Sequence, residues 1–165
     1  GDEWLHGCDI VRKVVAGGPQ RQDSVYNGFQ ALEESTEIAV VHDGVRPFAT
    51  PQMIKETVEA AEQHGTAITA IPVSDTIKQV ADGFVERTVS REGLWRVQTP
   101  QAFQYGLLQE AFAKAQKDSY YGTDEGALVE YLGKQVKIVS GSELNIKITR
   151  KEDLILGESL LSVEK

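Results

Sequence analysis

Residues 38–48 read IAVVHDGVRPF, and this stretch decides the fold. Ile38 to Val41 is a run of four apolar residues, which is typical of a strand buried on both faces of a sheet. The run stops at His42-Asp43-Gly44, and ligands of open α/β sheets bind just past the carboxyl ends of such strands. Asp43 and Arg46 therefore suit a substrate with hydroxyls and a phosphate, since Arg offers paired donors to phosphate oxygens. Alternatively, Asp43 and Arg46 pair with each other and only hold the turn.

The flanking sequence alternates helix and strand signals. Asp23-Ser24 can cap a helix, and Thr50-Pro51 begins another that Gly65 ends. Residues 67–73 form a second buried apolar run. This alternation predicts an α/β fold of the Rossmann-like nucleotide-binding type, with a doubly wound, mainly parallel sheet and helices on both faces.

Residues 74–91 follow a different pattern, with β-type alternation around the hairpin dipeptide Asp82-Gly83. A two-stranded ribbon is marginally stable alone, so the rest of the domain or a second subunit must cover it. We expect Trp95 and Val97 to return to the core. The remaining predictions are helices at 105–116, 123–132 and 151–163, and strands at 136–139 and 145–148.

The composition excludes several function classes. The chain has 165 residues and a net charge of −8, which argues against general nucleic-acid binding. Its single cysteine, Cys8, allows neither an intrachain disulfide nor a cysteine-based zinc site, and this fits a reducing cytoplasm. No apolar run approaches the roughly 18 residues of a membrane span, and no signal peptide is visible. We expect a cytoplasmic protein that binds neither membranes nor nucleic acid.

We interpret residues 1–165 as a single domain, with 74–91 as a projecting arm. An α/β domain usually opens with a strand and a glycine-rich turn, whereas residues 1–13 read GDEWLHGCDIVRK and lead only into the strand-like Val14-Val15. A small complete domain is one explanation. We favour a fragment that lacks its N-terminal strand-loop-helix unit.

Several polar residues stand where elements end. Gly17-Gly18 precedes a helix, where free N–H groups favour anions or polar ligand edges, but on local grounds we favour a plain capped turn. Thr76, Thr99 and Thr123 lie at three element ends; each alone is a structural cap, but together they favour a polar pocket. Lys147 stands between apolar neighbours, so it is either a solvated edge residue or a cation directed into a cleft. His42 follows the buried strand, and we assign it no role.

Six segments together carry a family resemblance: VAGGPQRQDSV, VVHDGVRPF, PVSDTIK, GLWRVQTPQAF, TDEGALVEYLG and NIKITRKEDL. In this order and spacing they resemble the 2-C-methyl-D-erythritol 4-phosphate cytidylyltransferases of the non-mevalonate isoprenoid pathway. The resemblance implies a nucleotidyltransferase that moves CMP from CTP to a sugar-alcohol phosphate and releases pyrophosphate. It also implies Mg²⁺ held mainly by the CTP phosphates, with no metal site on the protein, and a homodimer formed through the β-ribbon arm.

The resemblance also implies roles for individual residues. It assigns catalysis to two cations, with Lys147 at the CTP phosphates and Arg91 delivered by the arm into the partner's site. The residues that match sugar-phosphate contacts are Asp43, Arg46, Thr76, Thr99 and Thr123. Those that match nucleotide contacts are Gly18, Ser24 and Gly44.

The chain departs from the family pattern in three places. No segment matches the glycine-rich loop whose Arg and Lys grip the triphosphate, so we expect little or no transfer by these 165 residues alone. Pro19 and Ser90 each replace an acidic residue found in some members. Two alternatives stay open: a ribitol 5-phosphate cytidylyltransferase, against which GLWRVQ argues, and a non-catalytic dimerisation or binding module.

Overall fold

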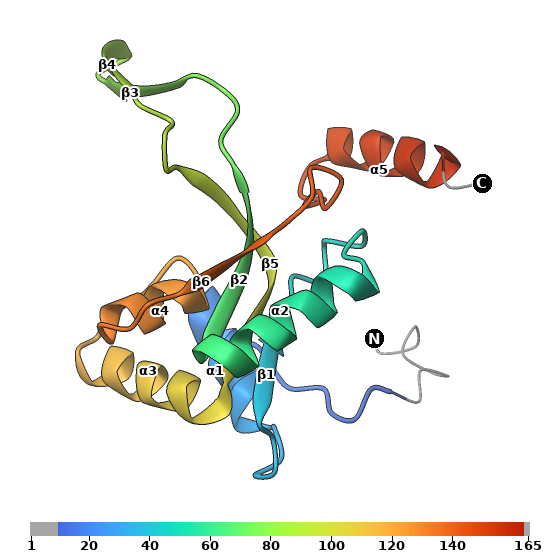
Figure 1. The fold of residues 1–165 in the computed structure, drawn as a ribbon, viewed down its shortest axis with the longest axis vertical. Coiled ribbons are helices and arrows are strands. Elements are labelled where there is room, and N and C mark those ends of the chain that lie inside the picture. Colours follow the sequence, from blue (N-terminus) through green and yellow to red (C-terminus); the bar gives the residue numbers. More distant parts are fainter. Residues whose placement is uncertain (1–9, 164–165) are drawn as a thin grey trace.

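The computed structural model describes residues 10–163, so Cys8 lies outside the described residues. The helices are α1 (Arg21–Gln30), α2 (Pro51–His64), α3 (Tyr105–Lys117), α4 (Glu125–Tyr131) and α5 (Lys151–Val163). The strands are β1 (Ile38–Val41), β2 (Thr66–Pro72), β3 (Ile77–Ala81), β4 (Phe84–Val89), β5 (Trp95–Gln104) and β6 (Lys137–Ser140). Helices and strands alternate from α1 to β2, after which three further strands and then two helices follow in succession before β6 and α5 (Figure 1).

The main sheet has four strands in the order β1-β5-β2-β6. β6 runs parallel to β2, whereas β5 runs antiparallel to both β1 and β2. β1, β2 and β6 therefore share one direction, and the α/β prediction with a mainly parallel sheet is confirmed. β5 was predicted only as a return to the core; it is a long reversed strand between β1 and β2.

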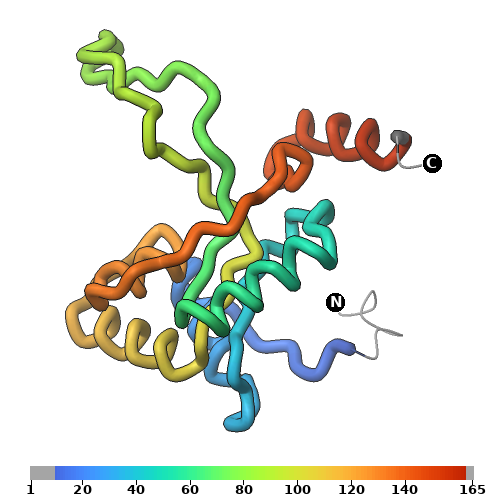
Figure 2. Tube along the Cα trace, viewed as in Figure 1, coloured from blue at the N-terminus to red at the C-terminus, as the bar shows by residue number. Residues whose placement is uncertain are grey.

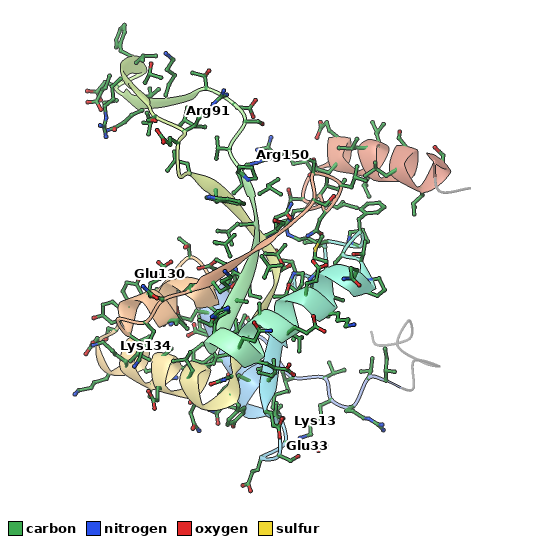
Figure 3. The ribbon with its side chains drawn as sticks, viewed as in Figure 1. Lys13, Glu33, Arg91, Glu130, Lys134 and Arg150 are labelled. Atoms are coloured by element: carbon green, nitrogen blue, oxygen red, sulfur yellow. The ribbon has the colours of Figure 1, made fainter. Side chains whose placement is uncertain are left out.

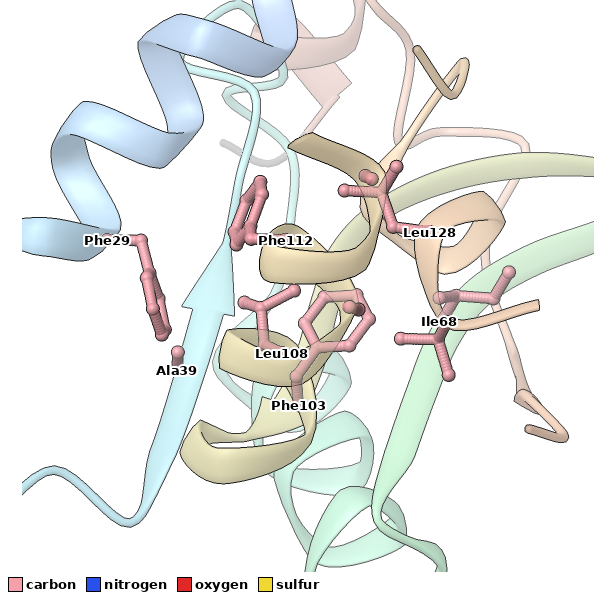
Figure 4. Close-up of a cluster of buried hydrophobic side chains, with 10 residues drawn as sticks. Phe29, Ala39, Ile68, Phe103, Leu108, Phe112 and Leu128 are labelled. Carbon is pink, nitrogen blue, oxygen red and sulfur yellow. The ribbon is translucent and has the colours of Figure 1, made fainter. Parts of the chain in front are cut away.

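Helices cover both faces of this sheet, because neighbouring residues of each strand point to opposite sides. Phe103 is fully buried and packs with Ile68, Leu108 and Phe112 on the face covered by α1, α3 and α4 (Figure 4). Its neighbour Ala102 packs on the other face, in a smaller cluster with Ala61 of α2. Figure 2 traces the chain through the sheet and these helices from the N-terminus to the C-terminus.

Local signals set the helix ends. Thr50 Oγ1 accepts from the Met53 N–H at 3.1 Å, and Gly65 ends α2 with a φ of 87°, so both predicted ends of α2 are confirmed. α1 differs from the prediction: it begins at Arg21, with Gln20 as its N-cap. Asp23 then lies in the first turn, where its carboxylate accepts from the Gln20 N–H at 3.0 Å.

The predicted ribbon is present. β3 and β4 pair antiparallel around Asp82 and Gly83, whose φ angles of 50° and 82° fit a two-residue hairpin turn. The ribbon projects from the sheet as an arm (Figure 1). Phe84 and Val85 on this arm are 79% and 60% exposed, so an apolar surface faces outward.

Three other predictions were wrong. Val14 and Val15 belong to irregular chain that joins no strand within the described residues. Residues 145–148 form no strand either, because only one hydrogen bond between backbone groups, from the Ile148 N–H to the Val45 carbonyl, joins them to the 42–46 turn, and their other links to it are made by side chains. Trp95 and Val97 are 42% and 43% exposed; β5 enters the core only from Gln98 onward.

Within residues 10–163, we find no helix with both the length and the apolar character that crossing a membrane requires. The same residues contain no cluster of three or more His, Cys, Asp and Glu side chains suited to a metal ion.

Candidate active site

A cavity of about 370 Å³ opens at the carboxyl end of β1, beside residues 97–101 of the antiparallel strand β5. Its size falls in the usual range for small-molecule sites. Side chains from both ends of the chain line it, and we call it the central cavity. The lining residues are Arg21, Asp43, Arg46, Ile68, Val97, Gln98, Thr99, Gln101, Thr123, Asp124, Ala127, Glu130 and Lys147.

One carboxylate and two cations form the charged centre of this cavity. Asp43 Oδ2 lies 3.1 Å from Lys147 Nζ and 3.4 Å from Arg46 Nε. Burial by itself would raise the pKa of Asp43. The hydrogen bond and the positive charge of Lys147 lower this pKa, with smaller contributions from the charge of Arg21 and the hydrogen bond of Arg46, and together these effects outweigh burial. Asp43 is therefore ionised at neutral pH and can accept from ligand hydroxyls.

The turn after β1 is fastened to β5 by a chain of hydrogen bonds. Thr99 Oγ1 accepts from the Asp43 N–H at 3.0 Å and lies 3.0 Å from His42 Nδ1. His42 Nε2 lies 3.1 Å from the Arg46 carbonyl. All these groups are satisfied when Thr99 donates to Nδ1 and the proton of His42 is on Nε2. His42 thus has a structural partner on each ring nitrogen.

Asn145, which was not among the residues predicted for the site, fixes the position of Arg46. Its side chain is fully buried and donates from Nδ2 to the Thr99 carbonyl at 2.9 Å. Its backbone carbonyl accepts from Arg46 Nη1 at 2.6 Å. The sequence offered one signal: Asn145 stands between the apolar residues Leu144 and Ile146, and an Asn that is buried with such neighbours needs hydrogen-bond partners inside the fold.

A second ion pair, also missed, closes the opposite wall. Arg21 Nη1 and Nη2 donate to the two carboxylate oxygens of Glu125 at 2.7 and 2.8 Å. The hydrogen bond to Glu125 is the main cause of the raised pKa of Arg21. Beside this pair, Gln101 Nε2 of β5 donates to Asp124 Oδ2 at 2.8 Å, which holds the start of α4 against the sheet.

The structure brings five of the predicted site residues together around the central cavity: Asp43, Arg46, Thr99, Thr123 and Lys147. Lys147 reaches it from irregular chain rather than from the expected strand. Its side chain is 42% exposed and points at Asp43, so the hypothesis of a cation directed into a cleft describes its placement.

The predicted nucleotide contacts lie beside the central cavity without lining it. The Gly18 N–H donates to Ser24 Oγ at 3.0 Å, so these two residues form one turn. A Cβ on Gly18 would lie 2.3 Å from the Asp23 Cβ, which explains the need for glycine there. Gly44 is exposed in the turn between Asp43 and Arg46.

Thr76 and Arg91 are not brought to the central cavity of their own chain. Both are exposed at the base of the arm, where an Arg91 guanidinium nitrogen donates to the Ser74 carbonyl. Figure 3 shows Arg91 well separated from Glu130 at the cavity wall. Their predicted roles stay predictions.

Comparisons with known proteins agree on one family. The sequence matches the family model for 2-C-methyl-D-erythritol 4-phosphate cytidylyltransferase over residues 5–163. The chain belongs to this family.

Two curated relatives with that name illustrate the similarity. The protein of Syntrophus aciditrophicus is 50% identical over 156 residues, covering 94% of this chain and 67% of the relative. The protein of Clostridioides difficile is 46% identical over 153 residues, covering 93% of this chain and 65% of the relative. The chain thus spans about two thirds of the length of these relatives.

Solved structures show the same fold. The 2-C-methyl-D-erythritol 4-phosphate cytidylyltransferase of Thermus thermophilus matches with a TM-score of 0.83 at 38% identity, covering 88% of this chain and 71% of that one. The 4-diphosphocytidyl-2C-methyl-D-erythritol synthase of Anaerococcus prevotii matches with a TM-score of 0.86 at 32% identity, covering 98% and 77%. The family resemblance predicted from the six segments is confirmed.

Proposed function

We propose that the protein carrying this chain transfers CMP from CTP to 2-C-methyl-D-erythritol 4-phosphate and releases pyrophosphate. Family membership supports this reaction, and so does the convergence of Asp43, Arg46 and Lys147 on one cavity. The cations suit a phosphate, and the ionised carboxylate suits the hydroxyls of a sugar alcohol.

In this reaction an oxygen of the sugar phosphate attacks the α-phosphorus of CTP. A new P–O bond forms, the bond between the α-phosphorus and its bridging oxygen breaks, and pyrophosphate leaves in line with the attack. The protein contributes mainly by positioning and by neutralising charge. We assign Arg46 to the sugar phosphate, Asp43 to its hydroxyls and Lys147 to the developing charge at the α-phosphate.

We propose further that Mg²⁺ arrives with CTP. Mg²⁺ is commonly held by substrate phosphates and one or two carboxylates rather than by an all-protein cage. The carboxylate of Asp43 is already paired with Lys147 and Arg46, and the described residues form no acidic cluster that could surround an ion. This set of residues therefore suits an ion held mainly by the phosphates of CTP. The ion would offset charge on the triphosphate.

The arm supports a homodimer in this proposal. Phe84 and Val85 expose apolar surface on the arm, and Leu154 and Ile155 do so on α5, at 52% and 68% exposed. Exposed apolar patches of this kind mark interaction sites. Thr76 and Arg91 lie at the base of the arm, from which we propose that they enter the partner's cavity.

A transfer assay tests the proposal. A chimera would join this chain to the part of the Syntrophus aciditrophicus relative that it does not cover, and pyrophosphate release would be followed with CTP and Mg²⁺. We expect turnover with 2-C-methyl-D-erythritol 4-phosphate, little with ribitol 5-phosphate, and a large loss in an Arg46→Met chimera. Turnover that prefers ribitol 5-phosphate would refute the assigned substrate.

A further inference from the structure

Buried and partly buried side chains join the first turn of α1 to the start of α4 and the residues just before it. Glu125 has a side chain only 1% exposed, and both its oxygens are bonded by Arg21. Gln22, 8% exposed, donates from Nε2 to the Tyr120 carbonyl at 3.1 Å and accepts from the Gly122 N–H at 2.9 Å. We call Arg21, Gln22 and Glu125 the helix clasp.

A buried carboxylate is weak evidence for stability alone. Removing an ion from water is costly, and well-packed apolar residues often stabilise such a position as well as a salt bridge does. The pair in the helix clasp also joins residues 104 positions apart in the sequence. A role in stability alone therefore does not explain why a buried ion pair, rather than apolar side chains, stands at Arg21 and Glu125.

The location of the helix clasp supplies an explanation. On the α1 side it adjoins the Gly18 turn, which packs against Asp23 and donates to Ser24. On the α4 side it adjoins Thr123 and Asp124, which line the central cavity. Arg21 itself lines this cavity and spans the distance between the two sides.

We infer that Glu125 is a positioning residue: through Arg21 it holds the Gly18 turn, which lies beside the central cavity, at a fixed spacing from Thr123, which lines it. This inference rests on the proposed function, in which the first side meets the nucleotide and the second meets the sugar phosphate. Holding both substrates in one geometry accelerates transfer, because a small misplacement lowers the rate steeply. Coupling between two sites is reciprocal, so nucleotide bound on the α1 side changes the affinity of the α4 side for the sugar phosphate by the same factor as the reverse.

The first test needs no ligand. In ¹H–¹⁵N spectra of Glu125→Gln, we expect the amides of Gly18 and Ser24 to shift, because the described contact from Glu125 to α1 runs through Arg21. Lys114→Met is the matched control, since it breaks an exposed ion pair with Asp118 at 2.8 Å and should leave both amides in place. Unchanged Gly18 and Ser24 amides in folded Glu125→Gln would overturn the inference.

Arg21→Lys is the second variant in case Glu125→Gln does not fold. It keeps a positive charge beside Glu125 but loses the two parallel N–H groups. We expect the same two amides to shift in this variant, and unchanged amides would count against the helix clasp.

The second test measures calorimetric affinity for 2-C-methyl-D-erythritol 4-phosphate well below the unfolding temperature. We expect Glu125→Gln to weaken binding about 3- to 30-fold, the range for residues that couple sites without touching ligand, and Lys114→Met to change it less than about twofold. A role in stability alone would lower the unfolding temperature and leave this affinity unchanged, which would overturn the inference. If the unaltered protein bound no sugar phosphate, the proposed function would fail, and the ligand-free spectra would still decide on the helix clasp.

Discussion

Replacing Lys147 with Met tests the charged centre of the cavity. Lys147 Nζ lies 3.1 Å from Asp43 Oδ2, with side chains 42% and 17% exposed. Two unit charges at this separation interact by about 1 kcal/mol in water and about 5 kcal/mol at the effective dielectric near protein surfaces. The exposure of Lys147 places the pair close to the lower value, and ordering a lysine side chain reduces it further. We therefore expect a coupling of about 1 kcal/mol.

The assay is a double-mutant cycle of urea unfolding at pH 7, with Lys147→Met, Asp43→Asn and the double variant. Lys55 and Glu59 form the matched control pair, 3.7 Å apart with side chains 67% and 51% exposed, for which we expect about 0.3 kcal/mol. Because the folded-state pKa of Asp43 is lowered, its pairing stabilises the fold above the unfolded pKa of about 4 and is lost as pH falls through the folded value. A coupling no larger than that of the control pair, or one that does not weaken as the pH is lowered from 7 into the acid range, would refute this reasoning.

Three further predictions address the core, the glycine turn and the arm. Phe103→Ala, at a fully buried position, should lower the free energy of unfolding by about 3–5 kcal/mol in urea titrations, whereas Val14→Ala, 63% exposed and away from the arm, should change it by less than about 0.5 kcal/mol; equal losses would contradict the packing described. Gly18→Ala should lower the free energy of unfolding by about 1–3 kcal/mol, because the new Cβ would lie 2.3 Å from the Cβ of Asp23. Gly28→Ala in α1 is the control: its new Cβ would meet no atom within 4 Å beyond its own helix, so the change should be neutral or stabilising. A harmless Gly18→Ala would show that the Gly18 turn is not tightly packed. In a dimeric, active chimera, Arg91→Ala should nearly abolish pyrophosphate release while Arg87→Ala on the same arm should not, and normal turnover of Arg91→Ala would remove Arg91 from the site.

Elements with local signals were predictable from the sequence. The IAVV run gave β1, Asp82-Gly83 gave the hairpin, and Thr50-Pro51 with Gly65 bounded α2. In each case the cause lies within a few residues of the effect: a side-chain cap, a glycine with positive φ or a short apolar run.

Features that depend on distant partners were not predictable. The insertion of β5 between β1 and β2, in the reverse direction, follows from pairing across the whole sheet. The predicted strand at 145–148 failed because its apolar alternation met only one backbone partner, at Val45. Alternation shows that a segment could be a strand but not whether a neighbouring edge is available.

The candidate site shows the same division. The chemistry and position of single residues directed attention to Asp43, Arg46, Thr99, Thr123 and Lys147, which all line the same cavity, and the family resemblance assigned each of them a role. The contacts of Asn145 with Arg46 and of Glu125 with Arg21 were not predicted, because the partners are about a hundred positions apart in sequence. Single positions of this kind gain meaning only once the fold brings their partners together.

Calorimetric titration of this chain with 2-C-methyl-D-erythritol 4-phosphate and with ribitol 5-phosphate tests the central claim most directly. The residues assigned to the sugar phosphate within the central cavity are all present in the chain, so the measurement does not depend on binding CTP. We predict binding that favours 2-C-methyl-D-erythritol 4-phosphate, is lost in Arg46→Met and persists in Lys55→Met. Preference for ribitol 5-phosphate, or equal binding by the Arg46→Met variant, would contradict the account.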